Sequence, residues 1–265
     1  MSRRARSADS RCQNAPTPAR GRAQESGRMD APARSRRRFL ALSAAATLAG
    51  EGAAAAEPLL VFTFGDSILD CARYNERGVH PGQLLVRNDD ALFPEFRGQD
   101  LQQRGARLEH RAVDGATVAG LPAQTRGLQR PAGPAVALLT VGGNDLLRGL
   151  AAAQGPGVRA FARSLEAFLR GLPIRPVLLG TVYDPTFGDD QRNFLGVEAK
   201  LARANHQRVN AVIGEAAARY GRLADLHAHF LRGDPSWYAY TIEPSLRGAS
   251  EVRRVFLPLV QAAAR

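Results

Sequence analysis

Cysteines and long apolar runs are scarce in this chain of 265 residues. The two cysteines are Cys12 and Cys71, and loss of an N-terminal segment would leave Cys71 alone, so an internal disulfide is not expected. A lone cysteine is most often small packing material. No run reaches the roughly 18 uninterrupted apolar residues that a membrane-spanning helix requires. The sequence therefore predicts neither a disulfide framework nor a transmembrane span.

Lysine occurs once, at Lys200, although the formal net charge is +11. Residues 1–56 hold 11 arginines against 4 acidic residues and so account for +7 of that charge. The remaining surplus is scattered, and no aromatic-rich basic motif accompanies it. Charge alone therefore gives no reason to expect a nucleic-acid partner. The 45% hydrophobic content with only 6% aromatic residues indicates a core built mainly of Leu, Val and Ala.

The first 34 residues are rich in Arg, Ser, Ala and Pro, and we expect them to be disordered. Ser35-Arg36-Arg37-Arg38-Phe39-Leu40 then opens a short, alanine-rich apolar stretch that ends in small residues before Glu57. This layout is typical of an export signal with its cleavage site. The Ser-Arg-Arg-x-Phe-Leu order resembles the twin-arginine signal of bacteria. We therefore predict a tail and signal over 1–56, the twin-arginine machinery as partner, and a periplasmic or extracellular location.

Residues 57–265 alternate between short apolar runs and helical patterns. The first run, 59–64, ends at Gly65 and has the length and composition of a buried parallel strand. We predict further strands at 107–113, 135–141, 176–181 and 223–226, and helices at 118–128, 157–171, 195–220 and 248–263. A long polar loop with a short helix near 91–96 is expected over 73–100. This alternation predicts an α/β fold, a three-layer α/β/α domain with a five-stranded parallel sheet.

Three predicted strands end in turns with the residue types of a hydrolytic site. These turns are Gly65-Asp66-Ser67, Asp114-Gly115 and Gly142-Gly143-Asn144-Asp145. Ligands of parallel sheets bind at the carboxyl ends of the strands, so the three turns should lie together. Taken alone, the serine fits a turn or a helix N-cap as well as it fits a nucleophile.

In that order, the three turns resemble those of the SGNH hydrolases, also called GDSL esterases and lipases. The resemblance implies a flavodoxin-like sheet, hydrolysis of a carboxylic ester and no cofactor. It assigns Ser67 as the nucleophile, which forms an acyl-enzyme. It also assigns Gly115, Asn144 and the Ser67 backbone N–H as donors to the oxyanion. Such donors stabilise the negative charge that develops in the tetrahedral intermediate.

The chain departs from the family pattern ahead of the last predicted helix. The family carries Asp-x-x-His-Pro there, whereas this chain has Tyr240-Thr241-Ile242-Glu243-Pro244. The usual Ser-His-Asp triad therefore cannot be transferred.

Three accounts of this departure stay open. Glu243 could take the serine proton itself, provided that burial raises its pKa above the ordinary value of about 4.3. Alternatively, His227 or His229 could act as the base, oriented by Glu243 or Asp225. In the third account the protein has lost catalysis and binds acylated polysaccharide.

Other polar residues near the predicted strand ends are candidates for substrate contact: Asp66, Asp70, Asn88 and Asp145. Asp66 and Asp145 could instead hold the turns through backbone hydrogen bonds. We expect no metal site, because no further Cys or His cluster accompanies His227 and His229. The polar first loop favours a small polar ester over a large lipid as the substrate.

Overall fold

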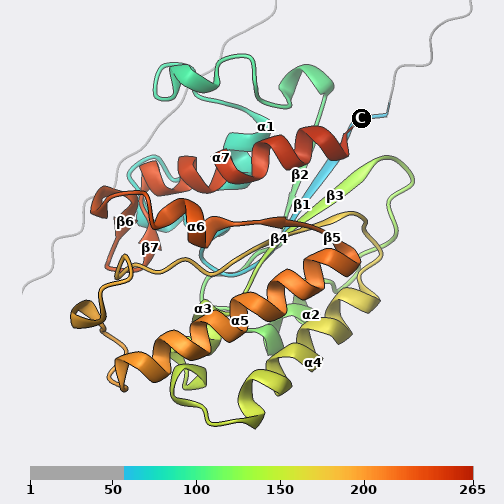
Figure 1. The fold of residues 1–265 in the computed structure, drawn as a ribbon. Coiled ribbons are helices and arrows are strands. Elements are labelled where there is room, and N and C mark those ends of the chain that lie inside the picture. The colour runs from blue at the N-terminus through green and yellow to red at the C-terminus, as the bar shows by residue number, and fades with distance from the viewer. Residues whose placement is uncertain (1–56, 265) are drawn as a thin grey trace, which may run out of the picture. The chain divides into compact units, whose positions relative to one another are not determined.

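Five parallel strands form the centre of the molecule (Figure 1). The computed structural model describes residues 57–264, so the predicted tail and export signal over 1–56 lie outside the described residues. The strands are β1 (Leu60–Gly65), β2 (Arg107–His110), β3 (Ala135–Thr140), β4 (Val177–Gly180) and β5 (Gly221–Ala224). Their order, β2-β1-β3-β4-β5, is the flavodoxin-like order.

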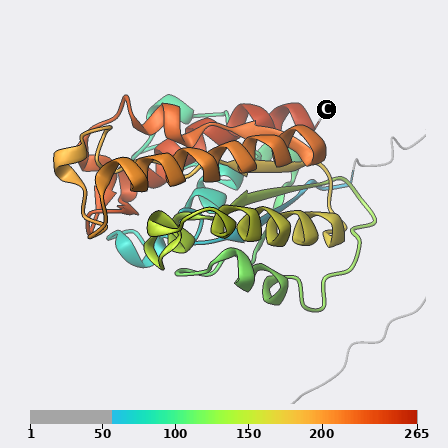
Figure 2. The ribbon, with the colours of Figure 1, turned by 60° about the horizontal axis from the view of Figure 1, so that its bottom comes forward.

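Seven α-helices surround this sheet in the described part of the chain (Figures 1 and 2). They are α1 (Pro81–Val86), α2 (Leu121–Gln124), α3 (Gly143–Leu147), α4 (Pro156–Gly171), α5 (Ala199–Tyr220), α6 (Leu226–Phe230) and α7 (Leu246–Ala263). A two-stranded antiparallel ribbon, β6 (Tyr238–Ala239) and β7 (Glu243–Pro244), precedes α7.

Successive side chains of β1 point to opposite faces of the sheet and enter two separate layers of the core. Val61 packs with apolar residues of α1, α6 and α7 on one face of the sheet. Phe62 and Phe64 pack with apolar residues of α4 and α5 on the other. Both faces are covered, which explains why the central strands read as continuous apolar runs. The predicted three-layer α/β/α fold with five parallel strands is confirmed.

The ends of several strands and helices differ from the predicted ones, because contacts with other parts of the fold determine where these elements end. The last strand ends at Ala224, paired with Gly180, instead of continuing to Leu226. The chain turns there into α6, whose N-terminus is capped by Asp225, which accepts a hydrogen bond from the Ala228 N–H at 3.0 Å. The predicted helix at 118–128 is a 3-10 turn followed by the short α2, and the loop over 73–100 contains α1, which the sequence analysis missed.

The turn after β1 is held by close backbone packing. A Cβ at Gly65 would lie 1.7 Å from the Thr140 carbonyl oxygen, and the φ of Gly65 is +115°. The side chain of Gln124 accepts from the Gly65 N–H and donates to the Gly65 carbonyl, each at 2.7 Å. Only glycine fits this position, which fixes where the residues that follow β1 lie.

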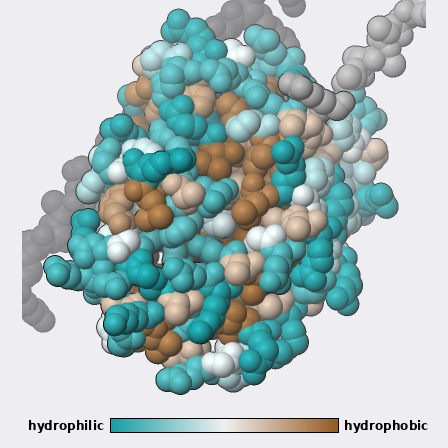
Figure 3. All heavy atoms as spheres, viewed as in Figure 1, coloured by the Kyte–Doolittle hydropathy of each residue, from teal (hydrophilic) through white to brown (hydrophobic). Residues whose placement is uncertain are grey.

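Cys71 is completely buried in the core and is a free thiol. In the view of Figure 3, apolar residues appear as separate patches among polar ones. Among residues 57–264, no helix is both long and apolar enough to cross a membrane.

We predict that Gly65→Ala lowers the free energy of unfolding by more than about 2 kcal/mol, because the methyl group overlaps the β3 backbone. The matched control is Gly127→Ala, where φ is +69° and no atom lies within 4 Å of the added Cβ. It should cost only the strain of a positive φ, about 1 kcal/mol. Urea unfolding of both variants measures the difference, and equal losses would contradict the steric explanation.

Candidate active site

Ser67, Asn144 and Glu243 line one cavity with a volume of about 110 Å³. Ser67 follows β1, and Asn144 lies in α3, directly after β3. Because β1 and β3 are neighbours in the sheet, their carboxyl ends bring the two residues together. The sheet order also reverses at this point, which is where ligands bind in open α/β sheets.

The ribbon formed by β6 and β7 carries Glu243 to the cavity. The turn between its strands places Tyr240 and Thr241 at positive φ, with Tyr240 80% exposed. The Tyr183 hydroxyl donates to the Ile242 carbonyl at 2.6 Å and fixes the strand that carries Glu243. Tyr240, which occupies the aspartate position of the family segment, therefore points away from the cavity.

The Glu243 carboxyl is half-buried beside the Ser67 hydroxyl. Burial raises the pKa of Glu243, and the interaction with Ser67 opposes this rise. Glu243 Oε2 is buried and has no hydrogen-bond partner among the described residues. Catalytic hydrogen bonds of this kind are commonly long before substrate binds. A carboxylate with a free oxygen next to a serine hydroxyl can accept the hydroxyl proton.

Asp66 is a second carboxyl at the cavity, 1% exposed. Its Oδ1 accepts from the Thr140 hydroxyl at 2.8 Å and from the Ile68 N–H at 3.2 Å, so it ties the Ser67 turn to β3. Its Oδ2 is buried without a partner. Burial raises the pKa of Asp66 to about 7, and the nearby Glu243 and Asp145 carboxyls add to the rise.

His227 and His229 do not line this cavity. Both lie in α6, because β5 ends before them. The His227 ring packs edge-on against His206, with 4.9 Å between ring centroids. His229 Nε2 lies 2.8 Å from Glu251 Oε2, and the His229 ring stacks on Trp237. The structure therefore brings Glu243, and neither of these histidines, to Ser67.

His206 does line the cavity, although the sequence analysis did not select it as a site residue. It lies on α5, and its Nε2 hydrogen-bonds the Val182 carbonyl at 2.8 Å. Asn210, one turn further along α5, donates to the same carbonyl at 2.9 Å. His206 and Asn210 are four residues apart and therefore lie on the same face of α5. This spacing of two polar residues was the signal in the sequence that could have identified His206.

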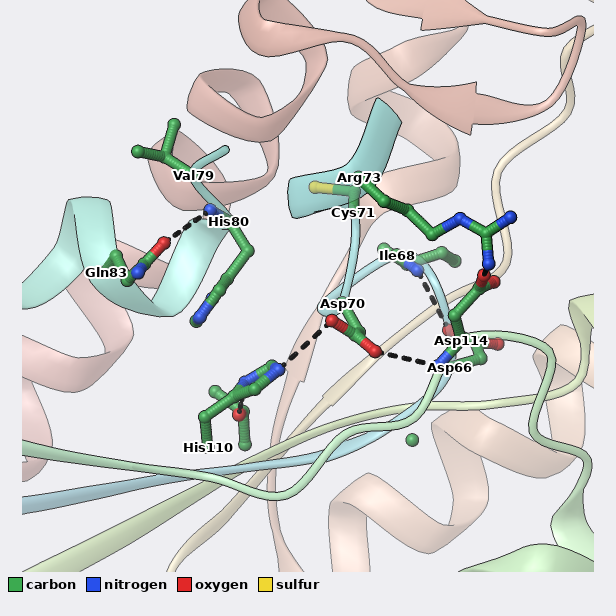
Figure 4. A network of polar contacts seen from close by, with 12 residues as sticks. Asp66, Ile68, Asp70, Cys71, Arg73, Val79, His80, Gln83, His110 and Asp114 are labelled. Carbon is green, nitrogen blue, oxygen red and sulfur yellow. Dashed lines mark hydrogen bonds and ion pairs between the residues drawn. The ribbon is translucent and has the colours of Figure 1, made fainter. Parts of the chain in front are cut away.

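Gly115 is not among the residues that line the cavity. It follows β2 with a φ of +77°, and its carbonyl accepts from Arg148 at 3.0 Å. The preceding Asp114 N–H donates to Asp70 Oδ2 at 2.9 Å, which links the Gly115 turn to the Ser67 turn (Figure 4).

The remaining substrate-contact candidates point elsewhere. Asp70 also lies 3.3 Å from His110 Nε2, and the His110 ring stacks on His80 (Figure 4). Asn88 Oδ1 accepts from the buried Arg253 at 2.6 Å. Asp145 accepts from the Val118 N–H. These three residues do not line the cavity, and each holds a loop in place.

We predict that Asp66 contributes a fall in the free energy of unfolding as pH rises from about 4 to about 7. The Asp66 carboxyl keeps its proton up to about pH 7 when folded, because its pKa is raised, but releases it near the ordinary pKa of 3.8 when unfolded. The folded state therefore binds more protons in this window, and stability is lost at up to about 1.4 kcal/mol per pH unit.

Asp66→Asn, which keeps the acceptor for Thr140 and Ile68, should reduce this slope. Urea unfolding at several pH values compares the variant with the wild type. The prediction is wrong if both proteins show the same pH dependence.

Comparisons with known proteins bear on the family and the fold of this chain. The model of the GDSL-like lipase/acylhydrolase family matches residues 63–249, more than half of the chain. No match was found among curated proteins.

Many solved structures share the fold, and two serve as examples. One is LAE5, an alpha/beta hydrolase enzyme from the metagenome of Lake Arreo in Spain. It has 22% sequence identity and a TM-score of 0.53, and the match covers 78% of this chain and 97% of LAE5. The other is a variant of Axe2, an acetyl xylan esterase from Geobacillus stearothermophilus. It has 22% identity and a TM-score of 0.54, with 77% of this chain and 95% of Axe2 covered. The sequence match and the architecture lead to one conclusion: the chain belongs to the GDSL-like lipase/acylhydrolase family and is a hydrolase that acts on ester bonds.

Proposed function

We propose that this protein cleaves a carboxylic ester through a Ser67 acyl-enzyme, with Glu243 as the general base. The observation that carries the proposal is the position of the half-buried Glu243 carboxyl beside the Ser67 hydroxyl in one cavity. A nucleophilic serine needs an adjacent base within reach of its proton.

The reaction then proceeds in two steps. Glu243 accepts the Ser67 proton while Oγ attacks the ester carbonyl carbon, and the carbonyl oxygen becomes an oxyanion. The Asn144 amide and the Ser67 N–H stabilise that charge. Collapse of the intermediate breaks the ester C–O bond, and the protonated Glu243 returns the proton to the departing alcohol. A water molecule, deprotonated by Glu243 in the same way, releases the acid and regenerates Ser67.

The raised pKa of Glu243 supports this role. An ordinary glutamate, with a pKa of about 4.3, is a weak base toward a hydroxyl. Burial raises the Glu243 pKa and so brings its basicity closer to that needed near neutral pH. The alternative bases have other neighbours, since His229 is paired with Glu251 and His227 packs against His206.

The site prediction is tested by labelling with a fluorophosphonate and by hydrolysis of a chromogenic ester. Ser67→Ala should abolish both, and Glu243→Gln should lower the rate by about 100-fold or more, because proton transfer contributes 10²–10⁴. His227→Ala and His229→Ala are matched controls that should keep the activity. The wild-type rate should fall as pH drops through the raised pKa of Glu243.

Two outcomes would contradict the proposal. Loss of labelling in His227→Ala or His229→Ala, with Glu243→Gln unaffected, would favour a histidine base. Absence of labelling and of hydrolysis in the wild type, tested from about pH 5 to about pH 9, would favour a protein that binds acylated polysaccharide without cleaving it.

We also propose that the protein is exported to the periplasm or beyond by the twin-arginine route, on the basis of the Ser-Arg-Arg-x-Phe-Leu order at 35–40. Changing both Arg36 and Arg37 to Lys should leave uncleaved precursor in the cytoplasm of a bacterial host. Fractionation and immunoblotting measure this, with Arg34→Lys as the control. Normal processing of the double variant would contradict the proposal.

A further inference from the structure

Apolar side chains form one wall of the cavity that holds Ser67. They come from α3, from the chain between β4 and α5, and from the β6–β7 turn: Leu146, Leu147, Val182, Phe194, Leu195 and Ile242. The wall begins beside the residues proposed to carry the reaction, since Leu146 and Leu147 follow Asn144 in the same helix.

Two large apolar residues of this wall are exposed to solvent. Leu147 is 44% exposed and Phe194 is 42% exposed. Exposed apolar residues that gather in a cavity mark a ligand site more reliably than scattered ones. A ligand in the cavity would remove both side chains from water.

Arg203, the arginine that lines the cavity, is already paired with two carboxylates. The Arg203 guanidinium donates to Asp184 at 3.2 Å and also to Asp190. Asp184 accepts further hydrogen bonds from Thr186 and from the Gly188 N–H. Arg203 is therefore neutralised and offers little attraction to an anionic substrate. The unpartnered carboxyl oxygens of Asp66 and Glu243 also disfavour an anion, so the apolar wall suits a neutral apolar group.

We infer that this cavity binds the acyl group of the ester and selects unbranched apolar acyl groups of four to six carbons over acetyl. This inference rests on the proposed function. An engineered apolar cavity of about 150 Å³ takes a six-carbon benzene ring, so about 110 Å³ corresponds to roughly four carbon atoms. The partly exposed side chains of Leu147 and Phe194 give a slightly longer chain further contact. An acetyl group would leave much of the wall uncovered.

The experiment measures kcat/KM for p-nitrophenyl esters of increasing acyl length. Each methylene buried against the wall should raise kcat/KM about fourfold, so butanoate should exceed acetate by on the order of tenfold. The gain should stop beyond hexanoate. Leu147→Gln and Phe194→Gln should flatten this dependence. The matched control is Leu223→Gln, because Leu223 is 40% exposed and lies on β5, outside the cavity.

Binding of neutral primary amides, from acetamide to hexanamide, separates this inference from the proposed function. Calorimetry should show affinity that rises with chain length in the wild type and in Ser67→Ala, and that no longer rises in Phe194→Gln. If amide affinity rises with chain length but no ester is hydrolysed, the preference of the cavity for longer acyl groups is supported and the catalytic proposal is contradicted. Ester hydrolysis that is as fast for acetate as for butanoate, with no length dependence in amide binding, would overturn the inference and leave the catalytic proposal standing.

Discussion

The contact between the end of β1 and the backbone of β3 is the constraint on which the site depends. Gly65 lies so close to the Thr140 carbonyl that no side chain fits, and Asp66 hydrogen-bonds the Thr140 hydroxyl. Gln124 holds the same glycine through both of its backbone groups. Ser67 is therefore positioned by the sheet itself. Asn144 follows the neighbouring strand, β3, at the same edge of the sheet. A nucleophile fixed in this way loses little freedom when a substrate binds.

Around this rigid centre, the structure gathers carboxyl groups instead of the family's imidazole. Burial raises the pKa of both Asp66 and Glu243. The Glu243 carboxyl adds to the rise at Asp66, and the Asp114 carboxyl adds to the rise at Glu243. Burial makes the folded protein more stable while Asp66 is protonated, whereas the proposed role of Glu243 requires that carboxyl to be ionised. The pH at which the protein is most stable and the pH at which it is most active are therefore expected to differ.

The sequence allowed prediction of the strands, because buried parallel strands read as continuous apolar runs that end in glycine turns. It also allowed prediction of Ser67, Asn144 and Glu243 as neighbours, through the family resemblance. His227 and His229 were harder to place, since a two-residue shift in where β5 ends moves both into α6. The apolar wall could not be predicted, because Leu147, Phe194 and Ile242 are distant in sequence and meet only through loops that pack on one another.

The position of Glu243 also affects the charge balance of the proposed reaction. A histidine base begins neutral and becomes a cation, so proton transfer creates separated positive and negative charges. A glutamate begins as an anion and becomes neutral, so a single negative charge moves from the carboxylate to the oxyanion. The reacting groups would thus carry the same net charge throughout, and no imidazolium would need stabilisation in a partly desolvated cavity. Without that cation, stabilisation of the oxyanion would fall entirely on neutral donors such as the Asn144 amide.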